Sequence, residues 1–563
     1  MSNQDARLRG PLPAVVDHII VGAGSAGSVL AARLSADPAR TVLLLEAGDP
    51  VDEDVARVPG MASSLWSGDT AYENLTVPQR GLDGRRIALT AGRGLGGSSS
   101  VNGMGWFHGH PEDYEGWAAN GASGWGWAEM APHLRHVEDH ELGAGPYHGT
   151  GGPMAITTPY HLHPITSRFI EAGAALGWPV NPDLNGASRE GIGLVQSNIR
   201  DGARHSVLDG YLNPALHRPN LTVRTGTPVQ KIALEGTRSV GVHSTGGAVR
   251  ARRSVVLCAG ALRTPHLLLL SGIGPRDELA RHGIPVAADL PGVGANLHDH
   301  PVVPMPWPII DAPALRGAYY EDPGLTYQMI RRGPLSAVGQ AAAVLRTDPG
   351  LTAPDLQLVL ALRGADAGRD PIPTPMVICL VCLLTPGSRG TVTLQSNDPA
   401  DPPTVDPSYL TLRSDLDRLR AGMRTALALF AASPLAAVIG PAAGLSADPQ
   451  DADLDRYIRA SAIPYWHPVG TARIGADELS VVDPDLNVHG ITGLQIADAS
   501  VFPAAPRANT QATVIAVAER AAELITRTRR LLSEPASSHH HGWGEMESLQ
   551  PDHSSIDQRT SHN

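Results

Sequence analysis

The sequence is poor in cysteine, and this scarcity excludes a disulfide framework. Three cysteines occur in 563 residues, too few to cross-link a chain of this length. Cys379 and Cys382 form a C-x-x-C pair inside an apolar run at 376–384, which has the pattern of a buried strand. Residues three apart on a strand point to opposite faces, so the pair is not predicted to bind a metal or to act as a redox centre.

Positive charge and long apolar runs are scarce as well. The formal net charge is −12 and the single lysine is Lys231, so the sequence lacks the basic patch that nucleic acid or an anionic membrane requires. No run approaches the roughly 18 apolar residues of a membrane-spanning helix, and residues 1–13 lack the apolar core of a signal peptide. We therefore predict a cytoplasmic protein without a nucleic-acid partner or a transmembrane segment.

The clearest positive signal lies at residues 16–48. An apolar stretch leads into Gly22, Gly24 and Gly27, spaced as G-x-G-x-x-G, and a second apolar stretch ends at Glu46. This order predicts strand, tight turn, helix and strand, with the helix N-terminus facing a pyrophosphate and the acid accepting hydrogen bonds from ribose hydroxyls. We predict a dinucleotide site; the alternative is a glycine-rich turn in an ordinary parallel sheet.

Glycine and serine dominate a second segment, 91–104, with the sequence AGRGLGGSSSVNGM. Such a segment cannot form a core, and we expect a loop whose backbone and hydroxyl groups lie against a flat or charged ligand. Four tryptophans follow, at positions 106, 117, 125 and 127, in a chain with 4% aromatic residues. They form a collar near a pocket or pack in the ordinary way, and the sequence leaves both interpretations open.

Histidines occur in pairs with metal-like spacing, as His-x-His at 108–110, 161–163 and 298–300. None of these pairs has a matched carboxylate or cysteine partner at a second place in the sequence, so we predict no bound metal. The segment 292–301, GVGANLHDHP, is expected to form a structural corner between lobes.

A histidine near the C-terminus is the strongest candidate for proton transfer. His467 stands between Trp466 and Pro468, which favour a rigid loop, and imidazole suits acid–base chemistry near neutral pH. Asn509 stands at the start of a predicted helix at 510–525, where it serves either as a helix cap or as part of a site.

The remaining pattern predicts two lobes, because 563 residues exceed what one core supports. Antiparallel strands are expected at 221–234 and 239–249, and a buried strand at 254–257 returns the chain to the nucleotide sheet. Residues 300–450 hold apolar strands and form a separate lobe. Helices are expected at about 167–176, from Thr264 to the glycines before Pro275, and at 416–431.

Four separated motifs together resemble the glucose-methanol-choline (GMC) family of FAD-dependent oxidoreductases. They are the segment 16–48, the GRGLGGSSSVNGM loop, GALRTPHLLLLSGIG at 260–274, and HPVGT with the later DAS and N-T-Q segments. The resemblance implies an α/β protein with a Rossmann-like FAD-binding lobe on a parallel sheet, plus an α+β substrate lobe built on an antiparallel sheet with helices. The implied division is an N-terminal tail at 1–14, an FAD-binding domain at 15–155, 200–300 and 455–528, a substrate-binding domain at 156–199 and 301–454, and a disordered tail at 529–563.

The resemblance also implies which residues contact FAD and which are catalytic. His467 and Asn509 correspond to the family's catalytic pair over the flavin. The cofactor contacts are Gly22, Gly24, Ser25, Ala26, Gly27 and Glu46 at the ADP half, Arg93, Gly96, Ser98 and Asn102 along the pyrophosphate and flavin, Val229 and Ala259 beside the adenine, Asp498 and Ala499 near the phosphates, and Trp466, Asn509 and Thr510.

The implied activity is oxidation of a primary alcohol to an aldehyde, with oxygen or a quinone-type acceptor reoxidising the flavin. His467 takes the hydroxyl proton while Asn509 positions the oxygen. Val101 stands where covalently flavinylated members have a histidine, so we expect FAD to be held without a covalent bond. Val359 replaces a second histidine of choline-oxidising members, which disfavours choline. The alternatives on this fold are a non-redox lyase of the hydroxynitrile lyase kind, a light-driven decarboxylase, and a binding protein with a vestigial flavin.

Overall fold

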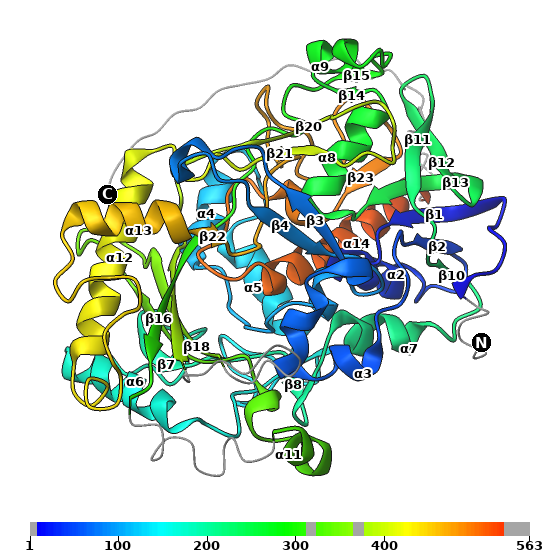
Figure 1. Ribbon diagram of the computed structural model, residues 1–563. Helices are drawn as coiled ribbons and strands as arrows, with labels where there is room; N and C mark the ends of the chain where they lie inside the picture. The colour runs from blue at the N-terminus through cyan, green and yellow to red at the C-terminus, as the bar shows by residue number, and fades with distance from the viewer. Residues whose placement is uncertain (1–7, 311–322, 364–375, 534–563) are drawn as a thin grey trace, which may run out of the picture.

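The computed structural model describes residues 8–310, 323–363 and 376–533 (Figure 1). A mixed seven-stranded sheet forms one lobe, with the strand order β10-β2-β1-β13-β12-β11 and β23 beside β13. Strands β10, β2, β1, β13 and β23 pair in parallel, whereas β13, β12 and β11 pair in antiparallel fashion. The strands are β1 Val15–Val21, β2 Val42–Leu45, β10 Leu221–Arg224, β11 Val229–Glu235, β12 Arg238–Ser244, β13 Gly247–Leu257 and β23 Leu494–Ile496.

Three helices belong to the same lobe as this sheet. Helix α2 (Ser25–Leu34) follows the glycine turn and packs against α14 (Gln511–Ser533), which comes from the other end of the chain (Figure 1). Helix α8 (Gly260–Leu270) follows β13. Apart from the exposed Val15, the apolar residues of β1 and β2 are buried in the core of this lobe, in keeping with a parallel sheet that is covered by helices.

Two details differ from the sequence-based expectation. Residues 221–224 form β10, which pairs in parallel with β2 and is not part of the antiparallel ribbon. Alternation of apolar residues marks a strand but not the direction of its partner. Helix α8 begins at Gly260, four residues before Thr264, and includes Pro265 in its interior. A proline has no N–H for the carbonyl four residues earlier, and this carbonyl, of Ala261, accepts a hydrogen bond from the hydroxyl of Thr471 at 2.5 Å instead.

The second lobe is a six-stranded antiparallel sheet in the order β22-β16-β19-β18-β17-β7. Its strands are β7 Gly191–Leu194, β16 Pro301–Pro308, β17 Gly339–Leu345, β18 Leu356–Arg363, β19 Met376–Leu383 and β22 Ile463–Pro464. Helices α6 (Pro164–Ala175), α12 (Arg413–Ala431) and α13 (Asp451–Ser461) contribute to the core on one face, and Figure 1 shows α12 and α13 beside β16 and β18.

Both faces of this second sheet are apolar. Leu358 and Leu360 of β18 lie in the core with the helices, while Val359 between them lies in a smaller cluster with Phe107 and Val195. On β19 the free cysteines Cys379 and Cys382 lie in different clusters, as expected of residues on opposite faces. A sheet that is apolar on both faces must be covered on both, and the side of Val359 faces the nucleotide lobe.

The remaining elements connect or cap these two sheets. They are α3 Glu53–Ala56, β3 Ala71–Leu75, β4 Ala88–Gly92, α4 Pro111–Ala119, α5 Trp127–Val137, β5 Glu138–His140, β6 Met154–Ile156, β8 Ile199–Arg200, β9 Ala203–Arg204, α7 Asn213–Ala215, β14 Ile273–Gly274, α9 Arg276–Arg281, β15 Ala288–Asp289, α11 Pro323–Ile330, β20 Thr391–Thr393 and β21 Thr404–Asp406. None of the helices in the described ranges is both long enough and apolar enough to cross a membrane.

The ends of the predicted domains need small adjustments. Strand β22 pairs with β16 in the antiparallel sheet, so we propose that the third segment of the FAD-binding domain begins after Pro464. Leu8 of the predicted N-terminal tail is buried in the core of the nucleotide lobe. Helix α14 continues to Ser533, five residues into the predicted disordered tail, and residues 534–563 lie outside the described part of the chain.

Candidate active site

The structure has two adjoining cavities, the first in the nucleotide lobe and the second between the lobes. The first, of about 260 Å³, is lined by the glycine turn, Glu46 and the start of α14. The second, of about 210 Å³, is lined by His467 and Asn509 and by strands β18 and β19. Five residues line both cavities, so an extended ligand in the first reaches the wall of the second; they are Gly92, Ser98, Trp466, Thr510 and Gln511.

The glycine turn has the geometry of a pyrophosphate cradle. Gly22 has φ +99°, and a Cβ on Gly27 would lie 1.9 Å from the carbonyl oxygen of Gly22, so both positions require glycine for the fold itself. A Cβ on Gly24 would instead find only the Cα of Gly97, at 3.9 Å. Gly24 is the N-cap of α2 and no side chain caps this helix, so its free N–H groups face the first cavity.

Glu46 has a structural role that the sequence did not indicate. Its carboxylate accepts hydrogen bonds from the N–H groups of Ala23 at 2.8 Å, Gly48 at 2.8 Å and Gly94 at 3.1 Å. Burial raises the pKa of Glu46, although these N–H groups oppose the change. Glu46 therefore fixes the turn, and it also lines the first cavity.

The glycine- and serine-rich loop packs directly on the cradle. The N–H of Gly96, at φ +80°, donates to the carbonyl of Ala23 at 2.8 Å, and a Cβ on Gly97 would lie 2.7 Å from the Cα of Gly24. Asn102 lines the second cavity and accepts a hydrogen bond of 2.8 Å from the buried Arg204, which the sequence analysis missed.

Most of the predicted cofactor residues line these cavities. Gly27, Arg93 and Gly96 line neither: the two glycines shape the cradle, and the guanidinium of Arg93 lies 5.6 Å from the centre of the Tyr72 ring. The first cavity is lined by Gly22, Gly24, Ser25, Ala26, Glu46, Ser98, Val229, Ala259, Trp466, Asp498, Ala499 and Thr510, and the second by Ser98, Asn102, Trp466, His467, Asn509 and Thr510.

Several further residues of the first cavity were not predicted. Arg263 of α8 lies 4.5 Å from the centre of the Tyr72 ring on the cavity wall, and its Nε is buried without a hydrogen-bond partner. Arg263 could have been predicted, because it lies inside the motif at 260–274. Tyr72 could not, because it comes from a loop-rich segment that has no recognisable motif. Of the four tryptophans at 106–127, three pack in the ordinary way and do not form a collar at a pocket. Trp106, Trp117 and Trp125 are fully buried in the core and line neither cavity.

His467 is the central polar group of the second cavity. Its Nε2 lies 3.3 Å from Nδ2 of Asn509, and its main-chain N–H donates to Oδ1 of Asp299 at 2.6 Å. Burial lowers the pKa of His467 well below its ordinary value, and the neighbouring His300 lowers it further. The imidazole is therefore neutral at pH 7 and able to accept a proton.

The expected corner at 292–301 is also part of this site. The main chains of His298 and Val469 exchange hydrogen bonds of 3.2 and 2.9 Å, and the N–H of Tyr465 donates to the carbonyl of His300 at 2.9 Å. This pairing of two distant segments brings Nδ1 of His300 to 2.9 Å from Nδ1 of His467. Sequence reasoning missed His300, because the register that unites the segments is a tertiary feature.

The rest of the second cavity is uncharged and largely apolar or aromatic, with polar side chains at Thr90, Ser98, Asn102, Asn509, Thr510 and Gln511. None of its lining residues is an aspartate, glutamate, lysine or arginine, within the ranges that the structure describes. Its wall includes Trp66, Val101, Met104, Phe107, Val195, Val338, Val359, Ala361, Leu380 and Tyr465. Val359 and Leu380 come from the antiparallel sheet, so both lobes build this cavity.

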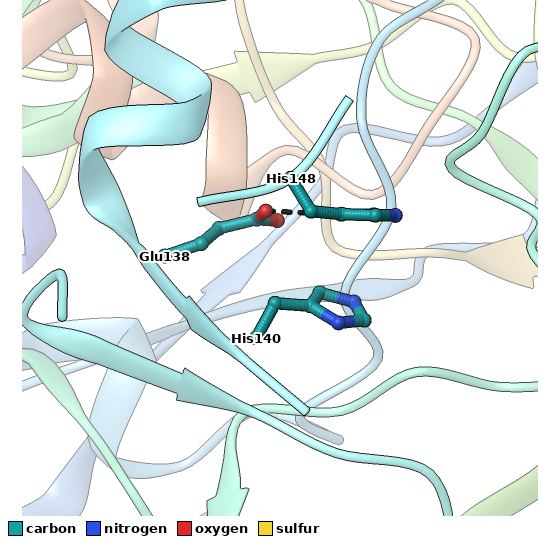
Figure 2. Close-up of side chains that lie close together, drawn as sticks. All are labelled: Glu138, His140 and His148. Atoms are coloured by element: carbon teal, nitrogen blue, oxygen red, sulfur yellow. Dashed lines mark hydrogen bonds and ion pairs between the residues drawn. The ribbon is translucent and has the colours of Figure 1, made fainter. Parts of the chain in front are cut away.

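A separate cluster of ionisable groups lies away from the two cavities. Glu138, His140 and His148 lie close together and are buried (Figure 2). His148 uses both ring nitrogens, with Nδ1 at 3.0 Å from Glu138 and Nε2 at 2.9 Å from Asp183. Burial alone would lower the pKa of His148, but the two carboxylates outweigh it and raise the pKa to about 9. Both ring nitrogens of His148 are thus occupied by carboxylates in this arrangement.

The same cluster corrects the expectation that the His-x-His pairs have no carboxylate partner. Nε2 of His108 lies 2.7 Å from Oε1 of Glu138, which also accepts a hydrogen bond of 2.8 Å from Nε1 of Trp106. Although burial raises the pKa of Glu138, the two histidines outweigh it and lower the pKa. Glu138 was missed because it stands alone in the sequence, 30 residues from His108.

Comparison with known proteins agrees with this geometry. Residues 16–302 and 386–518 match the N- and C-terminal models of the GMC oxidoreductases. The chain is 37% identical to mitochondrial choline dehydrogenase of Homo sapiens, covering 90% of this chain and 89% of that protein, and 36% identical to alcohol dehydrogenase [acceptor] of Pseudomonas putida, covering 92% and 97%. The crystal structure of pyridoxine 4-oxidase from Mesorbium loti is similar, with a TM-score of 0.82 and 32% identity over 91% of this chain and 99% of that one.

The fold and the two cavities define a flavin-dependent oxidoreductase of the two-lobed type. The chain belongs to the GMC oxidoreductase family, acts on CH–OH donors and has FAD as its cofactor. The structure fits this cofactor: the uncapped helix N-terminus and the open space at Gly24 suit a pyrophosphate, and the first cavity leads to His467.

Proposed function

We propose that the protein oxidises an uncharged primary alcohol to the aldehyde, with His467 as the general base. The observation that carries the proposal is the meeting of His467 and Asn509, 3.3 Å apart, at the wall of an apolar cavity that adjoins the cofactor cavity. An unactivated alcohol is a very weak acid, so removal of its proton must accompany loss of the hydride. When bound, FAD supplies the two-electron acceptor for that hydride.

His467 and Asn509 divide the work on the substrate oxygen. An alcohol oxygen beside the pair donates its proton to Nε2 of His467 and accepts a hydrogen bond from Nδ2 of Asn509. As the proton leaves, the oxygen gains negative charge, which the Asn509 amide stabilises in a cavity whose described lining holds no aspartate, glutamate, lysine or arginine. The position of Asn509 is fixed by the preceding Arg507, whose main-chain and side-chain N–H groups both donate to Asp113 at 2.7 and 2.6 Å.

The lining of the second cavity favours an apolar substituent on the alcohol carbon. Val101, Val359 and Leu380 offer van der Waals contact, and no lining carboxylate is among the described residues to pair with a cationic substrate. Burying an unpaired charge is costly. A neutral aliphatic or aromatic primary alcohol therefore fits better than a charged one.

A quaternary ammonium alcohol is the second candidate, and the aromatic side chains favour it. Trp66 and Trp466 lie with ring centres 5.2 Å apart, and Tyr465 lines the same cavity. Aromatic rings recognise quaternary ammonium groups through cation–π attraction, and relatives include choline dehydrogenases.

The experiment is anaerobic bleaching of the flavin by a panel of primary alcohols. The decisive pair is choline and 3,3-dimethylbutan-1-ol, which have nearly the same shape but differ in charge. We expect the neutral alcohol to reduce the flavin faster, and faster reduction by choline would establish the second candidate. A flavin that no alcohol bleaches would contradict both and leave the non-redox lyase or the light-driven decarboxylase.

The electron acceptor is tested on the reduced enzyme. We propose oxygen or a quinone-type compound, as in the implied family chemistry. Mixing alcohol-reduced enzyme with oxygen and measuring peroxide, and in parallel with a soluble quinone, distinguishes the two by the rate at which the flavin colour returns.

A further inference from the structure

We propose that His300 is a positioning residue that keeps the proton of neutral His467 on Nδ1 and so leaves Nε2 free to accept the substrate proton. This inference rests on the proposed function for its catalytic consequence, but not for the hydrogen bond itself. General-base action at Nε2 requires a lone pair there, and an isolated neutral imidazole divides its proton between two nitrogens.

The two rings are held in a geometry that suits one shared proton. Their Nδ1 atoms are 2.9 Å apart, and the ring planes are nearly perpendicular at 87°. Both side chains are buried, so water does not compete for this hydrogen bond. Because one proton lies between the two Nδ1 atoms, one ring donates and the other accepts.

The surroundings of His300 decide which ring donates. Nε2 of His300 is buried, and burial lowers the pKa of this ring, whereas main-chain acceptor groups of Leu384 and Pro506 raise it. Because Nδ1 of His300 faces His467, acceptors at the ring favour a proton on the remaining nitrogen, Nε2. His300 therefore carries its own proton on Nε2 and accepts the Nδ1 proton of His467.

The other end of His467 agrees with this assignment. The Asn509 amide presents Nδ2, a donor, to Nε2 of His467 at 3.3 Å, and a donor pairs with a lone pair. Burial lowers the pKa of His300 to about 4, so it stays neutral beside His467 at pH 7.

The nearby titratable groups do not compete for the shared proton. Asp299 accepts the main-chain N–H of His467 and the hydroxyl of Tyr409, at 2.6 and 2.5 Å. Burial raises the pKa values of Tyr465 and Cys382, and both groups are neutral at pH 7. His300 is thus the group that bonds Nδ1 of His467.

The first test observes the shared proton without any turnover. The measurement is NMR of the FAD-loaded protein, in which a strongly hydrogen-bonded imidazole N–H gives a far-downfield proton resonance. Labelling histidine with ¹⁵N assigns this proton to an Nδ1 atom. We expect such a resonance in the wild type and in His298→Asn, a matched control for a buried histidine of the same segment. It should vanish in His300→Leu and in His467→Gln. Its persistence in His300→Leu would overturn the proposal.

The second test measures the catalytic consequence with the best alcohol of the panel. We expect His300→Leu to slow the limiting rate of anaerobic flavin reduction at least about tenfold, since loss of tautomer control costs up to about 10⁴ in hydrolase triads. The alcohol concentration for half-maximal rate and the FAD content should change little. His300→Asn, whose Oδ1 replaces Nδ1 as an acceptor, should recover most of the rate.

The outcomes separate this proposal from the proposed function. Equal slowing by the Leu and Asn variants, or equal slowing by His298→Asn, would indicate a packing role and contradict positioning. If no alcohol reduces the wild-type flavin, the proposed function fails, and the downfield proton still decides whether His300 accepts from His467.

Discussion

At the scale of single residues, the proposed chemistry depends on groups whose environment sets their protonation. His467 is neutral because it is buried, and its acceptor nitrogen faces Asn509 rather than a carboxylate. The sequence predicted that both residues take part in one site, since each lies in a short recognisable motif, and the two side chains do meet in the second cavity. The sequence did not predict His300, because its proposed role depends on a 2.9 Å contact between segments 167 residues apart.

Replacing His467 should impair reduction of the flavin but not its binding. Of the two cavities, His467 lines the second, whereas the cradle at Gly24 lines the first. We expect His467→Ala to keep its flavin spectrum and to be reduced by alcohol at least about a hundredfold more slowly, as for loss of a general base. Asn509→Ala should be slowed less, because a water molecule can replace part of one hydrogen bond. Stopped-flow reduction without oxygen measures both, and a normal rate in His467→Ala would show that another group takes the proton.

At the scale of elements, the sequence predicted the helices and strands that depend on residues close together in the chain. The strand–turn–helix–strand unit of β1, α2 and β2 was predicted within a few residues, because glycine spacing and apolar periodicity are properties of neighbouring residues. The partner of β10 and the start of α8 were predicted wrongly. Strand pairing and the tolerance of a proline at position 265 depend on tertiary contacts, which a local pattern does not reveal.

Two glycines of the same turn should respond differently to substitution. A Cβ on Gly24 meets open space, whereas a Cβ on Gly27 would lie 1.9 Å from a carbonyl oxygen. We expect Gly24→Val to fold but to retain less than about a tenth of the FAD, because its side chain fills the pyrophosphate path. Gly27→Ala should fail to yield folded protein at all. Absorbance at flavin wavelengths and circular dichroism check the pair, and full FAD content in Gly24→Val would contradict the cradle.

At the scale of the whole molecule, the proposed site of catalysis lies at the junction of the lobes. Part of the apolar wall of the second cavity comes from β18 and β19, while its polar pair comes from the loop after β22 and the loop before α14. The lobes are also linked through the cluster around His148, which bridges Glu138 of β5 to Asp183 in the segment that leads to β7. Neither carboxylate could be assigned from the sequence, because the bridge joins segments that share no motif.

This bridge should make the stability of the junction depend on pH on the alkaline side. The pKa of His148 is raised from 6.5 to about 9, so its proton stabilises the folded state fully below pH 6.5 and is lost as the pH rises through 9. That difference corresponds to as much as about 3 kcal/mol. The urea concentration at the midpoint of unfolding of the FAD-loaded protein should therefore decrease as the pH is raised from 6.5 to 9.5. In His148→Gln this decrease should be much smaller. The control His217→Gln, at an exposed site, should behave like the wild type. If the midpoint decreases equally with pH in the wild type and in His148→Gln, the imidazolium does not link the lobes.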